Sequence, residues 1–173
     1  MSPTLGEPTR VSLVAPHGLQ EICASFGNIF DYLLTDHTLD QRWQTECLTH
    51  IELPFSLPLS WDRSRVVDHI SCHKLVAEVF VSVFADIQRA GLQQELTSFG
   101  GCFAFRAQRT GTKLSSHAWG IAVDLNSESN AQGTAGNMNA EVAATFTKAG
   151  FTWGGDWQGH SRDPMHFQFC SGY

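Results

Sequence analysis

Residues 115–126 read SSHAWGIAVDLN, and this stretch decides both the expected fold and the expected site. From Ile121 onward apolar and polar side chains alternate, which predicts a strand with its odd-numbered residues facing a core. Asp124 then lies on the opposite face of that strand. Gly120 allows the chain to turn just before the strand, so that His117 can approach Asp124.

A second strand repeats this pattern near the end of the chain. Residues 165–169 read MHFQF, which places His166 and Gln168 on one face and three apolar side chains on the other. Two imidazoles and one carboxylate form a ligand set that a catalytic zinc ion accepts, with the fourth tetrahedral position left for water. The sequence therefore predicts a zinc site made of His117, Asp124 and His166.

Catalysis at such a site also needs a base and a cation. Asp163 precedes His166 by three residues and is the candidate base, because zinc brings the pKa of its water to about 7 and a nearby carboxylate can take the proton. Arg106 is the candidate for stabilising the negative charge that develops on the substrate carbonyl. Alternatives remain at this point: Arg109 could supply the cation, and Asp163 could instead pair with Arg162.

The remaining segments predict helices around these strands. Apolar spacings of three, four and seven predict a long helix from Val66 to Ala90, ended by Gly91. Pro54 and Pro58 disfavour a helix over residues 51–62, which are expected to be an extended connection. The other expected elements are an irregular arm over residues 1–15, helices over 18–24 and 140–149, the latter capped by Asn139, and a turn entering a short strand over 100–106.

A rival metal site is conceivable on the expected long helix. His69 and His73 lie four residues apart, a spacing that lets two imidazoles share one ion. No Glu follows the first of them, and both project near the apolar face of that helix. We therefore expect them to be buried, hydrogen-bonded histidines. His160 is expected in a loop, from which it could reach the predicted zinc site.

Composition excludes several classes of protein. The chain has 173 residues, with 17 Asp and Glu against 11 Lys and Arg, and no basic run that could follow a phosphate backbone. Nucleic acid is therefore not expected as a partner, and neither is membrane insertion, because no stretch approaches about 20 apolar residues. Five scattered cysteines without a C-x-x-C pair predict free thiols. We expect a monomer.

The motif Ser115-x-His117-x-x-Gly120-x-Ala122-x-Asp124, followed by residues 153–157 (WGGDW) and by Asp163-x-x-His166, resembles the zinc peptidases of peptidoglycan. This family includes D-alanyl-D-alanine carboxypeptidases and the L-alanyl-D-glutamate endopeptidases of phage endolysins. The convincing resemblance covers residues 100–169.

This resemblance implies a single peptidase domain over residues 1–173 with an α+β fold, in which helices pack on a small, mostly antiparallel sheet beside an open cleft with one zinc ion. It implies that His117, Asp124 and His166 bind the metal, that Asp163 is the base and Arg106 the cation, and that Ser115 supports the site. The candidates for contacting substrate are Ser115, Trp153, Asp156 and Trp157.

The expected substrate is the stem peptide of peptidoglycan. The WGGDW segment and residues 101–106 (GCFAFR) look closer to the L-alanyl-D-glutamate endopeptidases, which favours a phage or prophage endolysin. A D-alanyl-D-alanine carboxypeptidase is the alternative. A non-catalytic, zinc-stabilised wall-binding module is a further one, although such a module needs no base at Asp163. Without a visible signal peptide, the protein is expected to be made in the host cytoplasm and to act at the cell wall.

Overall fold

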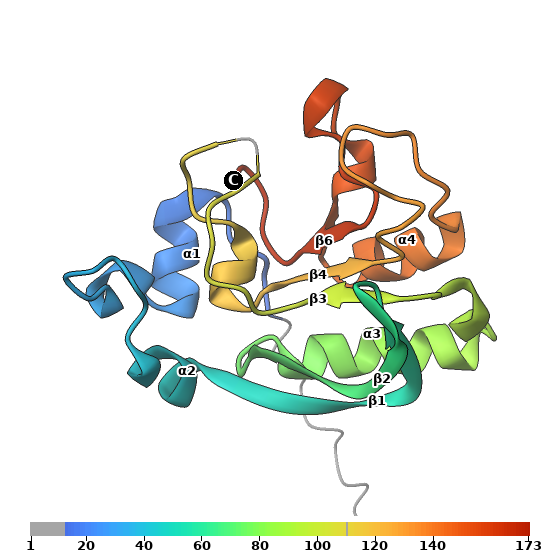
Figure 1. Ribbon diagram of the computed structural model, residues 1–173, viewed down its shortest axis with the longest axis horizontal. Helices are drawn as coiled ribbons and strands as arrows, with labels where there is room; N and C mark the ends of the chain where they lie inside the picture. Colours follow the sequence, from blue (N-terminus) through green and yellow to red (C-terminus); the bar gives the residue numbers. More distant parts are fainter. Residues whose placement is uncertain (1–12, 110) are drawn as a thin grey trace, which may run out of the picture.

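The computed structural model describes residues 13–109 and 111–173, so residues 1–12 of the expected arm lie outside the described part. Its strands form one six-stranded sheet in the order β2-β1-β3-β4-β6-β5, and every neighbouring pair is antiparallel except β1 and β3 (Figure 1). The predicted α+β class is confirmed. The strands are β1 (Leu48–Leu59), β2 (Asp62–His73), β3 (Phe99–Gly101), β4 (Ala122–Leu125), β5 (Thr152–Trp153) and β6 (His166–Gln168).

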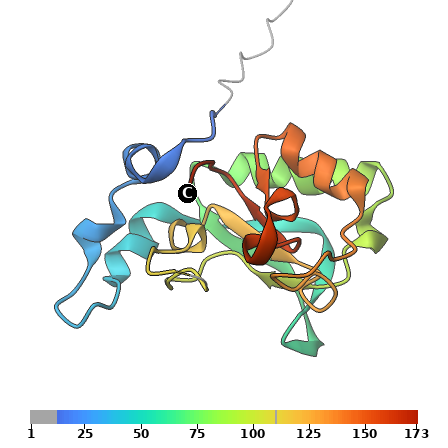
Figure 2. The same ribbon diagram turned by 90° about the horizontal axis from the view of Figure 1, so that it is seen from above.

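Helices cover one face of this sheet and one of its ends. Figure 2 shows α3 and α4 side by side, while α1 and α2 lie at the other end of the molecule. In the described ranges, no helix has the length and apolar character that crossing a membrane requires. The helices are α1 (Gly18–Phe26), α2 (Gln41–Cys47), α3 (Ala77–Arg89) and α4 (Ala140–Lys148), with short 3₁₀ segments η1 (Ile29–Tyr32), η2 (Gln93–Glu95), η3 (Ser116–Trp119), η4 (Gly154–Asp156) and η5 (Gly159–Ser161).

The first half of the predicted long helix is wrong. Residues 66–73 belong to β2, which pairs with β1 in a long hairpin, and the helix begins only at Ala77. A spacing of four, as between Val66 and Ile70, fits one face of a helix and also one face of a strand. The structure resolves this ambiguity, because Ile70 and Cys72 are buried with a period of two whereas Val66 is 63% exposed.

Residues 51–59 are extended, as expected, but they form part of β1 rather than a connection. The β1–β2 ladder is interrupted between Glu52 and Leu57 and again after Pro58. These interruptions coincide with Pro54 and Pro58, which lack the N–H that a regular ladder needs. The strand expected over residues 100–106 is also displaced, because β3 ends at Gly101.

The two short helices expected from the sequence are confirmed. Helix α1 ends before Gly27, which has a φ of 94°. Helix α4 begins after Asn139, whose side chain accepts hydrogen bonds from the backbone N–H groups of Glu141 and Val142. Such a cap satisfies donors that the first turn of a helix leaves unpaired.

Aromatic packing between the helices and the sheet fixes the orientation of β6. Phe167 stacks on Phe146 of α4 at a ring-centroid distance of 4.3 Å, and Phe146 contacts Phe84 of α3 at 5.9 Å. All three side chains are fully buried. Because side chains alternate along a strand, anchoring Phe167 towards the helices turns His166 and Gln168 to the opposite face.

Candidate metal centre and active site

Three buried side chains converge on the face of the sheet that the helices leave free. His117 Nε2 lies 3.1 Å from Asp124 Oδ1, and His166 Nδ1 lies 2.9 Å from the same oxygen. Potential ligand atoms of all three residues lie within 4.8 Å of one another. The structure thus brings together the three residues that the sequence named as metal ligands.

Strand register and one tight turn produce this convergence. Asp124 of β4 is directly opposite His166 of β6. His117 lies in η3, which ends at Gly120 in a left-handed conformation with φ 70° and ψ 27°. The Gly120 N–H donates to His117 O at 2.9 Å, which closes the turn and returns the chain to the start of β4.

The other ring nitrogen of each histidine faces an acceptor. His117 Nδ1 lies 2.6 Å from the backbone oxygen of Cys102, and His166 Nε2 lies 3.0 Å from Oε1 of Gln168. Both nitrogens must therefore carry the proton. In neutral imidazoles the nitrogens that face Asp124 then carry lone pairs.

Two lone pairs and a carboxylate oxygen around one point repel one another unless a cation lies between them. The donor set suits zinc, which binds neutral imidazole nitrogen and carboxylate oxygen. The three residues therefore fit a zinc ion by their chemistry as well as by their proximity.

When no metal is bound, protons on the histidines can supply part of the positive charge that these three groups require. Burial raises the pKa of Asp124, but the charges and hydrogen bonds of His117 and His166 outweigh burial and hold that pKa well below its usual range. Burial lowers the pKa of His166, whereas the hydrogen bond and charge of Asp124 raise it, and the net shift is upward. The site therefore stabilises positive charge beside Asp124.

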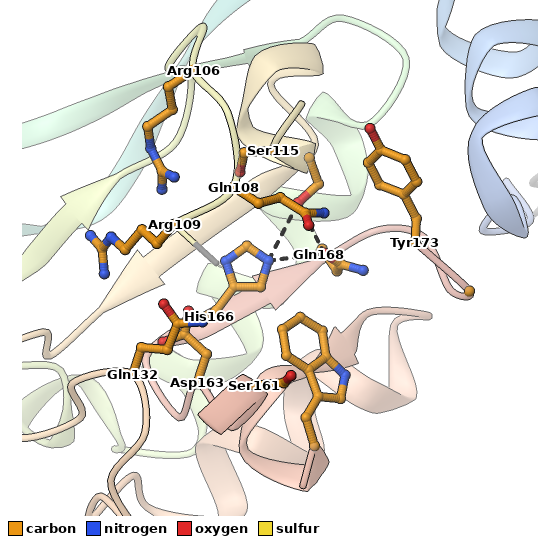
Figure 3. A pocket seen from close by; sticks show the side chains of 13 residues that line it. Arg106, Gln108, Arg109, Ser115, Gln132, Ser161, Asp163, His166, Gln168 and Tyr173 are labelled. Atoms are coloured by element: carbon orange, nitrogen blue, oxygen red, sulfur yellow. Dashed lines mark hydrogen bonds between the residues drawn. The ribbon is translucent and has the colours of Figure 1, made fainter. Parts of the chain in front are cut away.

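A pocket of about 370 Å³ opens above His166 (Figure 3). Arg106 and Arg109 lie along one side of it and Tyr173 lies on the other. Both candidate cations thus line the same pocket. The lining is largely polar and comprises Arg106, Gln108, Arg109, Ser115, Ser116, Gln132, Trp157, Ser161, Asp163, His166, Gln168, Gly172 and Tyr173.

Asp163 lies in the turn that leads into β6 and lines the pocket together with His166. Its backbone oxygen accepts from His166 N at 3.0 Å, and its Oδ1 atom is buried without a hydrogen-bond partner among the described residues. Burial raises the pKa of Asp163 to about 6, although the charges of His166 and Arg109 act in the opposite direction. A carboxylate with this pKa can accept a proton and release it again near neutral pH.

The WGGDW segment supports the turn that carries Asp163. Trp153 Nε1 donates to the backbone oxygen of Pro164 at 2.8 Å. Gly154 O accepts from Asp163 N at 2.8 Å, and a Cβ on Gly154 would lie 2.5 Å from Asp163 O. Of the segment's three candidates for contacting substrate, Trp157 lines the pocket, whereas Trp153 and Asp156 do not.

Ser115 both lines the pocket and caps η3, where its hydroxyl accepts from His117 N at 3.4 Å. Sequence reasoning assigned no role to Gln168 or Tyr173, which also line the pocket. For Gln168 a signal existed, because it shares a strand face with His166. For Tyr173 no signal existed, because its proximity arises only from the folded chain.

The rival pair of histidines does not form a site. His69 lies on β2, is exposed, and contacts Asp68 Oδ1 at 2.9 Å, so the expectation that it is buried in a helix is wrong. His73 is buried as expected, and its Nε2 donates to Phe26 O at 2.9 Å. Burial lowers the pKa of His73 to about 4. His160 is exposed in η5 and is not part of the pocket lining.

Across residues 13–109 and 111–173, the group of His117, Asp124 and His166 is the one cluster of at least three ligating side chains close enough to hold a metal ion. The five cysteines are free thiols, as expected. The group of His117, Asp124 and His166 is therefore the candidate metal site within the described residues.

Comparison with known proteins agrees with this geometry. Residues 108–169 match the model of a family described as D-alanyl-D-alanine carboxypeptidase. The matched segment contains His117, Asp124, Asp163 and His166, while Arg106 lies just before it. A comparison with curated protein sequences found no match. The matched segment is the part of the chain that builds the buried site, and the match supports a zinc peptidase of peptidoglycan.

Proposed function

We propose that this peptidase cuts the bond between L-Ala and D-Glu in the stem peptide, as a phage or prophage endolysin with one catalytic zinc ion. The observation that carries a hydrolytic role is Asp163, a pocket carboxylate beside the buried ligand cluster, whose buried Oδ1 has no hydrogen-bond partner within the described ranges. A structural metal site needs no such base and favours four protein ligands. This argues against a non-catalytic wall-binding module.

The proposed division of labour follows from the positions of the side chains. His117, Asp124 and His166 would hold the zinc ion, which when bound supplies a Lewis acid and a water of lowered pKa. Asp163 would accept the proton from the attacking water and return it to the departing amine, a role that its pKa of about 6 supports. Arg106 or Arg109 would stabilise the negative charge on the carbonyl oxygen.

Two cations in one pocket also suit the substrate. Stem peptides carry free carboxylates, and an arginine that is not stabilising the carbonyl oxygen can bind one of them through paired hydrogen bonds. Arg106 and Arg109 lie on the same side of the pocket, which permits this sharing of roles (Figure 3). Trp157 and Ser115 line the same pocket and are proposed to contact the peptide.

The choice of the L-Ala to D-Glu bond rests on the resemblance of residues 101–106 and 153–157 to the endopeptidases. The second candidate is a D-alanyl-D-alanine carboxypeptidase, which the description of the matched family favours. Both activities use the same ligands and base, and both act at the cell wall. We further propose that the chain forms one peptidase domain, which the single sheet shared by β1–β2 and the site strands supports.

A digest of purified muropeptides separates the two activities. The zinc-loaded protein is incubated with disaccharide pentapeptide, and the products are identified by mass spectrometry. We expect a disaccharide ending in L-Ala together with a peptide beginning with D-Glu. Release of D-Ala alone, with the L-Ala to D-Glu bond intact, would instead identify a carboxypeptidase. Metal analysis of the same sample should give one zinc ion per chain.

A further inference from the structure

The two histidines of the cluster direct different ring nitrogens at Asp124. His117 uses Nε2 and binds the Cys102 backbone through Nδ1, whereas His166 uses Nδ1 and binds Gln168 through Nε2. A backbone carbonyl can only accept, so the tautomer of His117 is fixed by the main chain. A side-chain amide offers both an acceptor and a donor, and the Ser116 hydroxyl, 3.3 Å from the same Nε2, can also act in either role. Because that hydroxyl donates to Gln168 Oε1, the tautomer of His166 depends on the orientation of Gln168.

The surroundings of Gln168 hold its amide in one orientation. Its Nε2 donates to the backbone oxygen of Cys170 at 3.4 Å, which turns Oε1 towards His166. The hydroxyl of Ser116 also donates to this Oε1, at 3.0 Å. Rotating the amide by half a turn would place an N–H₂ group against His166 and an oxygen against the Cys170 carbonyl, and the Ser116 hydroxyl could then only accept from this side chain.

The orientation of the Gln168 amide has consequences because the side chain is buried. Gln168 is only 3% exposed although it lines the pocket, so water has little access to its amide and an unpaired polar group there is destabilising. In the rotated state the Gln168 N–H₂ would require a lone pair on His166 Nε2. The proton would then move to Nδ1, and the nitrogen that faces Asp124 could no longer bind a metal.

We propose that Gln168 is a positioning residue that fixes the tautomer of His166, so that Nδ1 is presented to the metal. It acts through His166 and touches neither the metal nor the reacting atoms in this role. The inference concerns the ligand set and holds whichever stem-peptide bond is cut.

Zinc affinity, measured without substrate, tests the proposal. Gln168→Leu removes the amide acceptor and leaves only the more distant Ser116 hydroxyl, which is free to donate or accept, beside His166 Nε2. We expect zinc to bind about 10- to 100-fold more weakly in a competition with a chelator at constant pH. Gln168→Glu keeps an acceptor at the same place and should bind zinc more tightly than Gln168→Leu. Gln132→Leu is the matched control, because Gln132 lines the same pocket without a hydrogen bond to His166 among the described contacts, and its zinc affinity should equal that of the wild type.

Nitrogen NMR of the zinc-loaded wild type, labelled with ¹⁵N-histidine, shows directly which atom binds. We expect His166 to have a protonated Nε2 and a metal-bound Nδ1, and His117 the reverse. Melting temperatures of the metal-free variants separate loss of affinity from loss of folding. An unchanged zinc affinity of folded Gln168→Leu, or a metal-bound Nε2 at His166, would overturn the proposal. Neither result would bear on which peptide bond is hydrolysed.

Discussion

Two pairs of histidines face each other across neighbouring strands or turns in the described part of this molecule, and only one of these pairs belongs to a group that could hold a metal ion. His117 and His166 have their ring centroids 5.0 Å apart in the buried site, and His50 and His69 lie 6.2 Å apart on the β1–β2 hairpin. The separations are similar, whereas the surroundings differ. The buried pair shares Asp124, while His50 contacts Ser71 and His69 contacts a different partner on its own strand.

Solvent explains why this difference is decisive. Asp124 is 4% exposed, whereas the Asp68 side chain beside His69 is 74% exposed. Charges attract strongly in a buried site and weakly in water, where the dielectric constant is high. Proximity of histidines is thus a poor indicator of a metal site unless a shared carboxylate and exclusion of water accompany it.

The largest expected effect tests this contrast directly. His117→Ala removes one of three ligands, so the protein should lose stoichiometric zinc and its hydrolytic activity should fall by at least about 1,000-fold. His69→Ala is the matched control and should retain both. Zinc content by elemental analysis and turnover of muropeptides measure the two variants. Equal zinc loss in both would show that the buried pair is not the metal centre.

Removing the base should separate binding from catalysis. Asp163→Asn is expected to retain zinc and to lose about 100- to 10,000-fold in turnover, the usual contribution of a general base. Asp68→Asn, which changes a carboxylate beside a hairpin histidine, should leave both properties unchanged. The same zinc and turnover measurements apply. Full activity of Asp163→Asn would refute the assignment of the base.

The site was more predictable from the sequence than the first half of the fold. Alternation placed Asp124 and His166 on polar strand faces, and Asn139 marked the start of a helix, because these signals are local. The β1–β2 hairpin was missed because the spacing of Val66 and Ile70 fits two structures, and the pairing that decides between them involves a distant part of the chain. The role of Gln168 depends on an amide orientation, which a sequence does not record.

Gly120 lies where the turn that carries His117 meets the β1–β2 hairpin. Its oxygen accepts from His73 N at 2.9 Å, and a Cβ at Gly120 would lie 2.9 Å from that nitrogen and from Leu48 Cδ2. Gly120→Ala should therefore lower the free energy of unfolding by about 2–4 kcal/mol, from its left-handed backbone and from the forced shift of the hairpin. Chemical denaturation measures the loss. Gly133→Ala, also at positive φ but with no atom within 4 Å of its Cβ, should cost only the backbone part.

A smaller effect contrasts two histidines of the same strand. His73 has its pKa lowered to about 4 by burial, so the unfolded chain binds a proton at this residue before the folded one does. The contribution of His73 to the free energy of unfolding is present above pH 6.5, the pKa of the unfolded state, and is lost as the pH falls towards 4. The loss amounts to about 2 kcal/mol at pH 5. His73→Gln should therefore show a weaker decline in stability between pH 7 and pH 5 than the wild type, followed by denaturant titration. His69→Gln should decline like the wild type, and the same decline in His73→Gln would contradict this account.

The contact between Gly120 and the end of β2 also limits what the signature motif can do alone. Residues 100–169 contain every proposed metal ligand and the base, yet the turn that carries His117 rests on a strand from the other half of the chain. A fragment reduced to these residues would keep all of the ligand side chains. It would lose strand β2, whose His73 N–H donates to Gly120 O and supports the turn that carries His117. The segment that carries the family motif is therefore shorter than the segment that the folded site requires.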